Sequence, residues 1–190
     1  MPHSWDGKWN LGAELGQGGQ GITHVATFAD DPSVRGVLKR LKRRKSQQAR
    51  ARMRREVTNL QALATVVHSV PRVLDHNTGD FEDQNVELFV VMDLIEGPTL
   101  MEHVENAGPL EAGAAVAFTM SLCKTVELAH KEGVLHRDLK PDNVIVRNAE
   151  DSELVVIDYG LSFNTDDESV TQTGETFRNK FLTLPETVAP

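Results

Sequence analysis

A cluster of four glycines near the start of the sequence could bind phosphate groups. It reads Gly16-Gln17-Gly18-Gly19-Gln20-Gly21, and glycine lets the backbone approach a phosphate because no Cβ stands in the way. A dinucleotide-binding site would need a helix directly after the glycines. Residues 22–28 are strand-like instead, which favours a glycine loop between two strands. Taken alone, the cluster also fits an ordinary glycine-rich hairpin.

A lysine and a glutamate give the second chemical signal. Lys39 closes the short stretch Val37-Leu38-Lys39, and Glu56 lies on a predicted amphipathic helix downstream. A strand lysine that is held by a helix glutamate can neutralise the α- and β-phosphates of a nucleotide. An isolated strand lysine is usually solvated, and the neighbourhood is rich in basic residues. The pair by itself therefore leaves both interpretations open.

The decisive string is His136-Arg137-Asp138-Leu139-Lys140-Pro141-Asp142-Asn143, which is followed by Asp158-Tyr159-Gly160. Asp, Asn and Pro are common in turns, but turn chemistry does not explain the whole ordered series that begins at the glycine cluster. The chain resembles the protein kinase family over residues 11–186. The resemblance implies an α+β, bilobal fold, with a five-stranded N-lobe sheet, one N-lobe helix and a truncated helical C-lobe.

The resemblance also implies a role for each residue of the site. Asp138 would accept a hydrogen bond from the substrate hydroxyl, and Lys140 would neutralise the γ-phosphate. Asn143 and Asp158 would supply oxygen ligands to Mg²⁺. The residues that bind ATP would be Leu15, Gly16, Gly18, Gly21, Thr23, Val37, Lys39, Glu56, Met92, Asp93, Ile95 and Ile145. Lys140 is typical of kinases that phosphorylate serine or threonine, so the expected partner is a protein substrate with such a residue.

The sequence departs from the family pattern at several positions. Thr23 stands where valine is usual, Val37 where alanine is usual, and Tyr159 replaces a phenylalanine. Asn179 falls where serine/threonine kinases carry a threonine, although residues 177–186 are similar to a subset of bacterial eukaryotic-like kinases. Asn179 and the short C-terminal lobe leave an alternative function open, a pseudokinase or nucleotide-binding regulatory module with little transfer activity.

The resemblance also implies an activation segment, which would run from Ser162 to about Lys180. Candidate phosphorylation sites in it are Ser169, Thr171, Thr173 and Thr176. The chain stops soon after Leu184-Pro185-Glu186, before the helices that follow in the family. A fragment of a longer protein is therefore expected, with a natural minimal kinase or a dimer as alternatives. We expect residues 1–190 alone to be marginally stable, prone to associate and weak in transfer.

The elements that must position these residues divide at about residue 96. Residues 1–96 are predicted to form the N-lobe, with strands at 11–15, 22–28, 36–41, 70–75 and 87–92. Its helix carries Met53, Val57, Leu60 and Ala64 at helical spacing. Residues 97–190 are predicted to form a partial C-lobe, with a helix over 110–131 that ends at Gly133. Two short strands, 144–146 and 154–157, flank a turn.

Composition and charge exclude several classes of protein. The net charge is −8 and Cys123 is the single cysteine, so an intrachain disulfide is impossible. Ten of the 20 basic residues lie between Lys39 and Arg55, but no aromatic residues are interleaved to stack on bases. A solvated helical face is the preferred interpretation, and no nucleic-acid partner is expected. No signal peptide or apolar run of membrane-spanning length is recognised, so a cytoplasmic location is expected.

Overall fold

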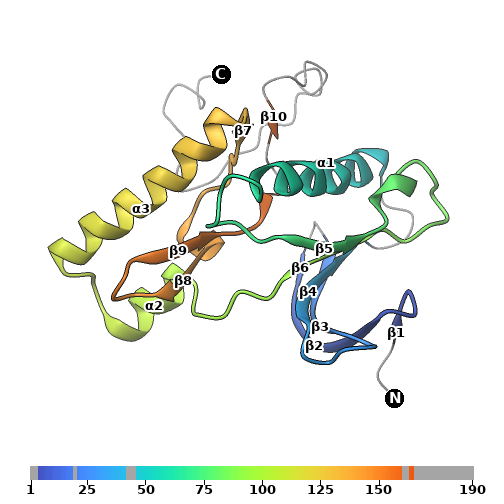
Figure 1. Cartoon of the computed structure of the whole chain (residues 1–190), viewed down its shortest axis with the longest axis horizontal. Helices are drawn as coiled ribbons and strands as arrows, with labels where there is room; N and C mark the ends of the chain where they lie inside the picture. The colour runs from blue at the N-terminus through green and yellow to red at the C-terminus, as the bar shows by residue number, and fades with distance from the viewer. Residues whose placement is uncertain (1–3, 19–20, 42–45, 160–162, 165–190) are drawn as a thin grey trace.

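The N-terminal half of the chain forms one antiparallel sheet with a helix across it. The computed structural model describes residues 4–18, 21–41, 46–159 and 163–164. Within these, the sheet has the strand order β1-β2-β3-β4-β6-β5 (Figure 1). The strands are β1 (Ser4–Trp5), β2 (Trp9–Gly18), β3 (Gly21–Phe28), β4 (Arg35–Arg40), β5 (Val73–His76) and β6 (Phe89–Asp93).

The five predicted strands are confirmed as β2 to β6, and the structure adds β1 at the edge of the sheet. β1 pairs with β2 through Trp5 and Trp9, around a turn in which Asp6 and Gly7 both have positive φ. An Asp-Gly pair between two aromatic residues is a hairpin signal, which the sequence analysis passed over. β5 begins at Val73, two residues after Pro71 and later than the predicted start at residue 70.

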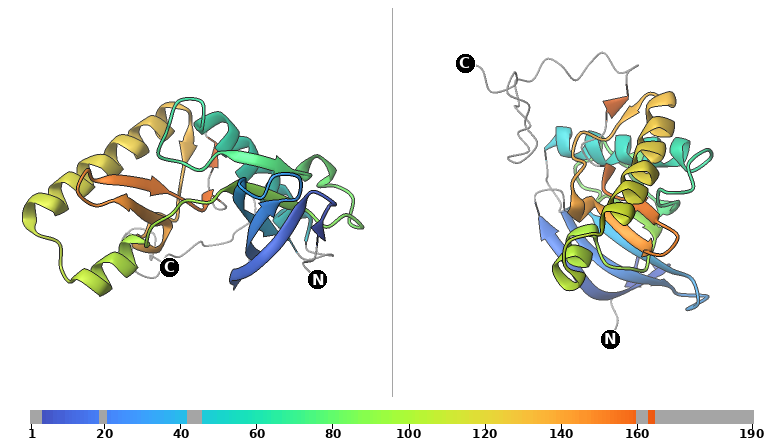
Figure 2. Two further views of the ribbon diagram at one scale, coloured as in Figure 1. Left: turned by 60° about the horizontal axis from the view of Figure 1, so that its bottom comes forward. Right: turned by 90° about the vertical axis from the view of Figure 1, so that its left-hand side faces the viewer.

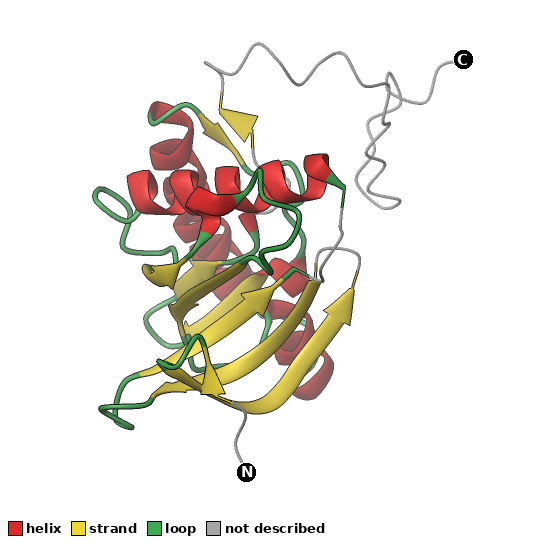
Figure 3. Ribbon diagram, turned by 90° about the vertical axis from the view of Figure 1, so that its right-hand side faces the viewer, coloured by secondary structure: helices red, strands yellow, loops and turns green. Residues whose placement is uncertain are grey.

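Helix α1 (Gln47–Leu63) lies across the sheet (Figure 3). Ser46 caps its start by accepting a hydrogen bond from the backbone N–H of Ala49 at 3.3 Å. Met53 and Val57 pack against residues of the sheet and its connections, which are Leu41, Leu88 and Val90. The predicted helix is thereby confirmed, with Ala64 as its C-terminal cap.

The basic run that leads into α1 is not the uniformly solvated face that the sequence suggested. Arg50 is 0% exposed and Lys39 is 8% exposed. The guanidinium of Arg40 pairs with Glu87 at 3.0 Å and that of Arg54 lies 4.4 Å from the ring centroid of Phe81. These side chains are paired within the fold because long basic side chains bury their stems and find polar partners for their heads.

The second half of the chain is built on one long helix and short strands. These elements are α2 (Leu100–Ala107), α3 (Ala112–Lys131), β7 (Val134–Leu135), β8 (Val144–Asn148), β9 (Glu153–Val156) and β10 (Phe163–Asn164). α3 lies alongside the β8–β9 hairpin in both views of Figure 2. Phe118 of α3 packs there against Val144, Val146 and Leu154. Gly133, at φ 72°, follows the end of α3 as predicted.

Helix α2 was missed at the level of sequence. Thr99 caps it by accepting a hydrogen bond from the backbone N–H of Glu102, and the Glu102 carboxylate accepts one from the backbone N–H of Thr99. This reciprocal pair is a capping box, which the spacing Thr-x-x-Glu predicts. The helix is only eight residues long, so apolar periodicity alone could not reveal it.

One apolar cluster joins the two halves. It contains Leu60 and Leu63 of α1, Ala129 of α3, Val156 of β9, and Tyr159. Because α1 contributes to this cluster and also packs on the sheet, it fixes the sheet relative to β9. Residues that follow β9 are therefore held close to residues that lie on α1.

Within the described part of the chain, α3 has the length and apolar character of a membrane span. The mean hydropathy of its 18-residue window is 1.2, and 17% of that window is buried. A core helix of a water-soluble protein meets the same criterion, so one such helix is weak evidence. One such candidate does not overturn the expectation that the chain carries no membrane segment, which stays a prediction.

Gly97 marks a close approach that a side chain would prevent. Its φ is 132°, and a Cβ placed there would collide with the carbonyl oxygen of Val146. Gly97→Ala should therefore destabilise the fold by about 1–3 kcal/mol. Gly113→Ala is the control, since a Cβ there meets nothing within 4 Å and should stabilise α3 by about 0.5–1 kcal/mol. Urea unfolding of both variants measures this, and equal effects would contradict the prediction.

Candidate active site

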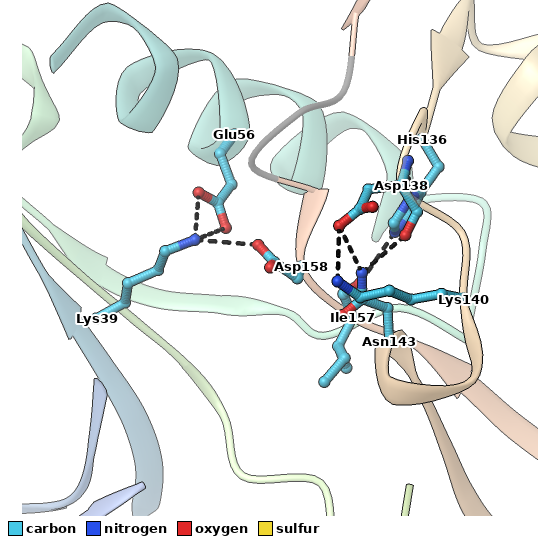
Figure 4. Close-up of polar contacts among 8 residues, drawn as sticks. All are labelled: Lys39, Glu56, His136, Asp138, Lys140, Asn143, Ile157 and Asp158. Atoms are coloured by element: carbon cyan, nitrogen blue, oxygen red, sulfur yellow. Dashed lines mark hydrogen bonds and ion pairs between the residues drawn. The ribbon is translucent and has the colours of Figure 1, made fainter. Parts of the chain in front are cut away.

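Lys39 of β4 reaches two carboxylates that come from distant parts of the chain (Figure 4). Its Nζ lies 2.9 Å from each carboxylate oxygen of Glu56 on α1 and 3.2 Å from Oδ1 of Asp158. Glu56 is buried and Asp158 is partly exposed. The structure thus forms the Lys39–Glu56 pair that the sequence predicted, and it adds Asp158 to the pair.

The two carboxylates outnumber the single ammonium, and this sets the direction of the pKa shifts. Burial lowers the pKa of Lys39, but the charges of Glu56 and Asp158 outweigh it, so the net shift is upward. Burial raises the pKa of Glu56, Lys39 opposes this, and the charge of Asp158 adds to the rise. Both pKa values are therefore raised, that of Lys39 by the two carboxylates and that of Glu56 mainly by its burial.

A second group of polar side chains lies in the loop between β7 and β8. The side-chain Nδ2 of Asn143 donates to the backbone oxygen of Asp138 at 2.7 Å and to its Oδ2 at 3.2 Å. Nζ of Lys140 lies 3.2 Å from the same Oδ2. The three residues that the sequence assigned to catalysis are therefore held together by direct contacts.

His136 fixes the start of this loop. The backbone N–H of Asp138 donates to its Nδ1 at 3.3 Å, which requires an unprotonated Nδ1. Nε2 therefore carries the proton and donates to the carbonyl oxygen of Ile157 at 3.0 Å. Burial lowers the pKa of His136, in keeping with a neutral ring. The ring centroids of His136 and Tyr159 are 4.6 Å apart, and Leu60 packs in the cluster that contains Tyr159.

Asp158 sits at the point where β9 ends, and its backbone is in the left-handed region at φ 62°. The backbone N–H of the preceding residue, Ile157, donates to the carbonyl oxygen of Asn143 at 2.9 Å. This bond joins the Asp158 segment to the Asp138 loop. Left-handed φ is uncommon outside glycine, although aspartate tolerates it, and such strain concentrates at functional sites.

Asn143 and Asp158 have the chemistry of a site for Mg²⁺. Both amide hydrogen bonds of Asn143 use its nitrogen, which leaves the amide oxygen as the atom that can bind a cation. Among the described residues there is no group of three or more His, Cys, Asp or Glu side chains that could hold a metal. Few protein oxygens are what Mg²⁺ needs when nucleotide phosphates and water supply the other ligands.

The predicted nucleotide-binding residues of the sheet share one face. Thr23 pairs with Lys39 across β3 and β4, and Val37 pairs with Met92 across β4 and β6. Directly opposed residues point to the same side of a sheet, as do residues two apart. Thr23, Val37 and Met92 are therefore on the face from which Lys39 reaches Glu56.

The remaining nucleotide-binding candidates lie on the glycine hairpin and on the connection between the two halves. Gly18 and Gly21 are paired at the end of the hairpin, and Gly16 is opposite Thr23. Leu15 is 55% exposed. Asp93 ends β6, Ile95 follows it, and Ile145 of β8 bridges to Thr99.

Arg72, which the sequence analysis did not single out, holds Asp93 in place. Its Nε lies 2.8 Å from Oδ2 of Asp93 and its Nη2 lies 3.2 Å from Oδ1. The backbone N–H of Arg72 donates to the same carboxylate, and Asp93 raises the pKa of the guanidinium. No local signal could have found this pair, because the partners are 21 residues apart in the chain.

Several predictions fall on residues 160–162 and 165–190, which lie outside the described residues. They concern the four candidate phosphorylation sites, Asn179 and the Leu184-Pro185-Glu186 segment. They stay predictions from the sequence.

The site is of the kinase class. It combines a glycine hairpin, a buried lysine–glutamate pair, and the Asp138 loop bonded to the Asp158 segment. Comparison with known proteins agrees: the chain belongs to the protein kinase family, whose domain description, "Protein kinase domain", matches residues 9–186. The described strands and helices are those of its N-lobe and of part of its C-lobe.

The relatives are serine/threonine and calcium-dependent protein kinases. "Calcium-dependent protein kinase 8" of Oryza sativa subsp. japonica is 35% identical over 158 residues, covering 82% of this chain and 28% of the relative. "Serine/threonine-protein kinase PknD" of Mycobacterium tuberculosis is 35% identical over 170 residues, covering 88% and 24%. "Probable serine/threonine-protein kinase PknB" of Lactococcus lactis is 29% identical over 182 residues, covering 94% and 27%. The chain thus spans about a quarter of the length of these relatives.

Loss of the Lys39 ammonium should make folding stability depend on pH. In Lys39→Met, the buried Glu56 loses its counter-charge, so its pKa, already raised by burial, should rise further. An acid with a higher pKa in the folded state contributes stability at low pH, and this is lost as the pH rises above the usual carboxyl range. The loss should approach about 1.4 kcal/mol per pH unit between the unfolded and folded pKa values.

Urea unfolding at about pH 5 and about pH 8 measures this dependence. Lys131→Met is the matched control, because Lys131 forms an exposed pair with Glu127. The added pH dependence should disappear in Lys39→Met combined with Glu56→Leu. A slope for Lys39→Met equal to that of the parent chain would show that Glu56 does not depend on Lys39 for its charge.

Proposed function

We propose that this chain is the core of a serine/threonine protein kinase that transfers the γ-phosphate of ATP to a protein hydroxyl with the help of Mg²⁺. One observation carries the proposal. Asp158 contacts Lys39 from the sheet, while the residue before it bonds Asn143 of the Asp138 loop. Groups suited to bind phosphates and metal are thereby adjacent to groups suited to orient a hydroxyl. Phosphoryl transfer depends mainly on such positioning and on charge neutralisation.

Lys39 would bind the α- and β-phosphates of ATP, with Glu56 keeping its ammonium in place. Its raised pKa keeps it charged at neutral pH, as phosphate binding requires. Asn143 and Asp158 would hold Mg²⁺, which when bound neutralises phosphate charge and orients the nucleotide. Thr23, Val37 and Met92 would cover the adenine on the sheet face that they share with Lys39.

Asp138 would orient the attacking hydroxyl. An ordinary aspartate is a weak base at neutral pH, so its main contribution is alignment, and it accepts the proton late in the reaction. Lys140 contacts the same carboxylate and would neutralise the phosphate that moves toward the hydroxyl. The choice of serine or threonine is supported by Lys140 and by the names of the relatives.

Three further points from the sequence enter the proposal. We assign residues 1–96 to the N-lobe and 97–190 to the part of the C-lobe that this chain contains. The partner is a protein substrate, with no nucleic acid and no membrane segment involved. The cytoplasmic location and the choice between a longer parent protein and a dimer stay predictions.

The decisive experiment is transfer of radiolabelled phosphate from ATP to a generic protein substrate, by this chain and by a longer form, with and without Mg²⁺. Transfer that needs Mg²⁺ and labels serine or threonine is the expected result, at up to about 1–100 turnovers per second in the longer form. Nucleotide binding without transfer in both forms would instead favour the regulatory module suggested by Asn179 and the short C-terminal lobe.

Changing Asp158 or Asp138 to asparagine should abolish phosphate transfer for different reasons. Asp158→Asn should weaken Mg²⁺-dependent binding of ATP, because an oxygen ligand of the metal loses its charge. Asp138→Asn should leave ATP binding intact and abolish transfer, because only the alignment of the hydroxyl is lost. Calorimetric titration of each variant with ATP at saturating Mg²⁺ separates them. Matching affinities would contradict this division of roles.

A further inference from the structure

Arg50 lies near the start of α1 and is completely buried beneath the β5–β6 loop, which comprises residues 77–88. Its Nε donates to the carbonyl oxygen of Phe81 at 2.7 Å, and its Nη1 donates to that of Val86 at 2.8 Å. Its Nη2 donates to the carbonyl oxygens of Asp80 at 3.0 Å and Asp83 at 2.6 Å. A guanidinium has five N–H groups in a rigid fork, so one side chain ties α1 to four points of the loop.

The β5–β6 loop is closed upon itself before it meets Arg50. Asp80 and Asp83 each donate their backbone N–H to the carbonyl oxygen three residues earlier, which curls the chain into successive turns. Asn77 closes the base of the loop: its Nδ2 donates to the carbonyl oxygen of Glu87, and its Oδ1 accepts from the backbone N–H of Phe89. The loop is thus anchored to β6 and presents fixed carbonyl groups to α1.

Arg50 is further than Glu56 from the end of α1 that is held in the shared cluster, so holding Arg50 in place limits the displacement of Glu56. Leu60 and Leu63 hold the C-terminal end of α1 in the cluster shared with β9 and Tyr159. At a rise of 1.5 Å per residue, Glu56 is about 6 Å from Leu60 and Arg50 is about 15 Å from it. A tilt of α1 about that end would therefore displace Arg50 about two and a half times as far as Glu56.

Hydrogen bonds tolerate only a few tenths of an ångström before they weaken, so four bonds at the far end of the helix resist even a small tilt. We propose that Arg50 is the positioning residue that keeps α1 in place and so keeps Glu56 within reach of Lys39. The importance of the Lys39–Glu56 pair for phosphate transfer rests on the proposed function. The mechanical link between Arg50 and Glu56 does not.

Arg50→Lys is the variant of choice, and Arg54→Ala is its matched control. Lysine keeps the positive charge and the long stem, but its compact ammonium has three donors and cannot span four carbonyl groups. Arg54 is on the same helix, and its guanidinium lies over the ring of Phe81 in the same loop. The control therefore removes a basic side chain and a contact with the loop without touching the carbonyl bonds.

The first measurement is a double-mutant cycle on kcat/KM for phosphate transfer. Arg50→Lys should lower kcat/KM roughly 10- to 100-fold, the effect of misplacing a group by about 1 Å. In a Glu56→Gln background it should change kcat/KM by no more than about two-fold, because the group that it positions is already lost. Arg54→Ala should have little effect in either background. A drop of the same size in both backgrounds, or a lower melting temperature with unchanged kcat/KM, would reduce Arg50 to a general stabilising role.

The second measurement is amide hydrogen exchange in residues 47–60, which requires no activity. Arg50→Lys should speed exchange from the first turn of α1 through Glu56 and leave exchange in α3 unchanged. Faster exchange that is confined to residues 77–88, or that is uniform over the chain, would overturn the proposal. If neither this chain nor a longer form transferred phosphate, the proposed function would fail, and this exchange experiment would still decide the role of Arg50.

Discussion

The burial of the Lys39 ammonium between two carboxylates is the interaction on which the arrangement of this molecule depends. A buried charge costs several kcal/mol unless partners with good geometry compensate it. Here one partner comes from α1 and the other follows β9. The lysine is therefore stable in its position only when the sheet, the helix and the β8–β9 hairpin are all in place. The charge that would bind phosphate is thus held in position only when both halves of the fold are assembled.

Apolar packing brings these three elements together. α1 has two contacts along its buried stripe, with Met53 and Val57 against the sheet and Leu60 and Leu63 against the cluster that includes Tyr159. Tyr159 directly follows Asp158, and its ring also packs on that of His136 at the start of the Asp138 loop. One shared cluster therefore positions Glu56, Asp158 and the loop at the same time. Apolar packing, which has no preferred direction, brings α1, the sheet and β9 together. The ion pairs of Lys39 with Glu56 and Asp158 then fix their relative positions.

The sequence predicted the groups that act locally and missed those that act over long distances. The string from His136 to Asn143 carries its contacts within a few residues, so its recognition gave the loop directly. Lys39 and Glu56 could be paired because the strand and the helix each had a clear pattern. Arg50 and Arg72 could not be placed, because their partners lie at least 21 residues away and a basic residue on a helix or a loop has no pattern that distinguishes burial from solvation. β1 and α2 were missed because periodicity needs more residues than they have, although a turn and a capping box were present.

The electrostatic state of the site follows from the same arrangement. The charges of Glu56 and Asp158 raise the pKa of Lys39, while the raised pKa of Glu56 is due mainly to its burial. Two carboxylates thus face one ammonium, which is an excess of one negative charge. Asp158 is the partly exposed member and stands in a left-handed backbone conformation, so it is the carboxylate that solvent and a cation can reach. A cation bound to Asp158 would reduce that excess, while the ammonium of Lys39, with Glu56 as its buried partner, would keep its charge for an anion. The site is therefore complementary to a ligand that combines a hard cation with a polyanion, which is the chemistry of the metal–nucleotide complex in the proposed function.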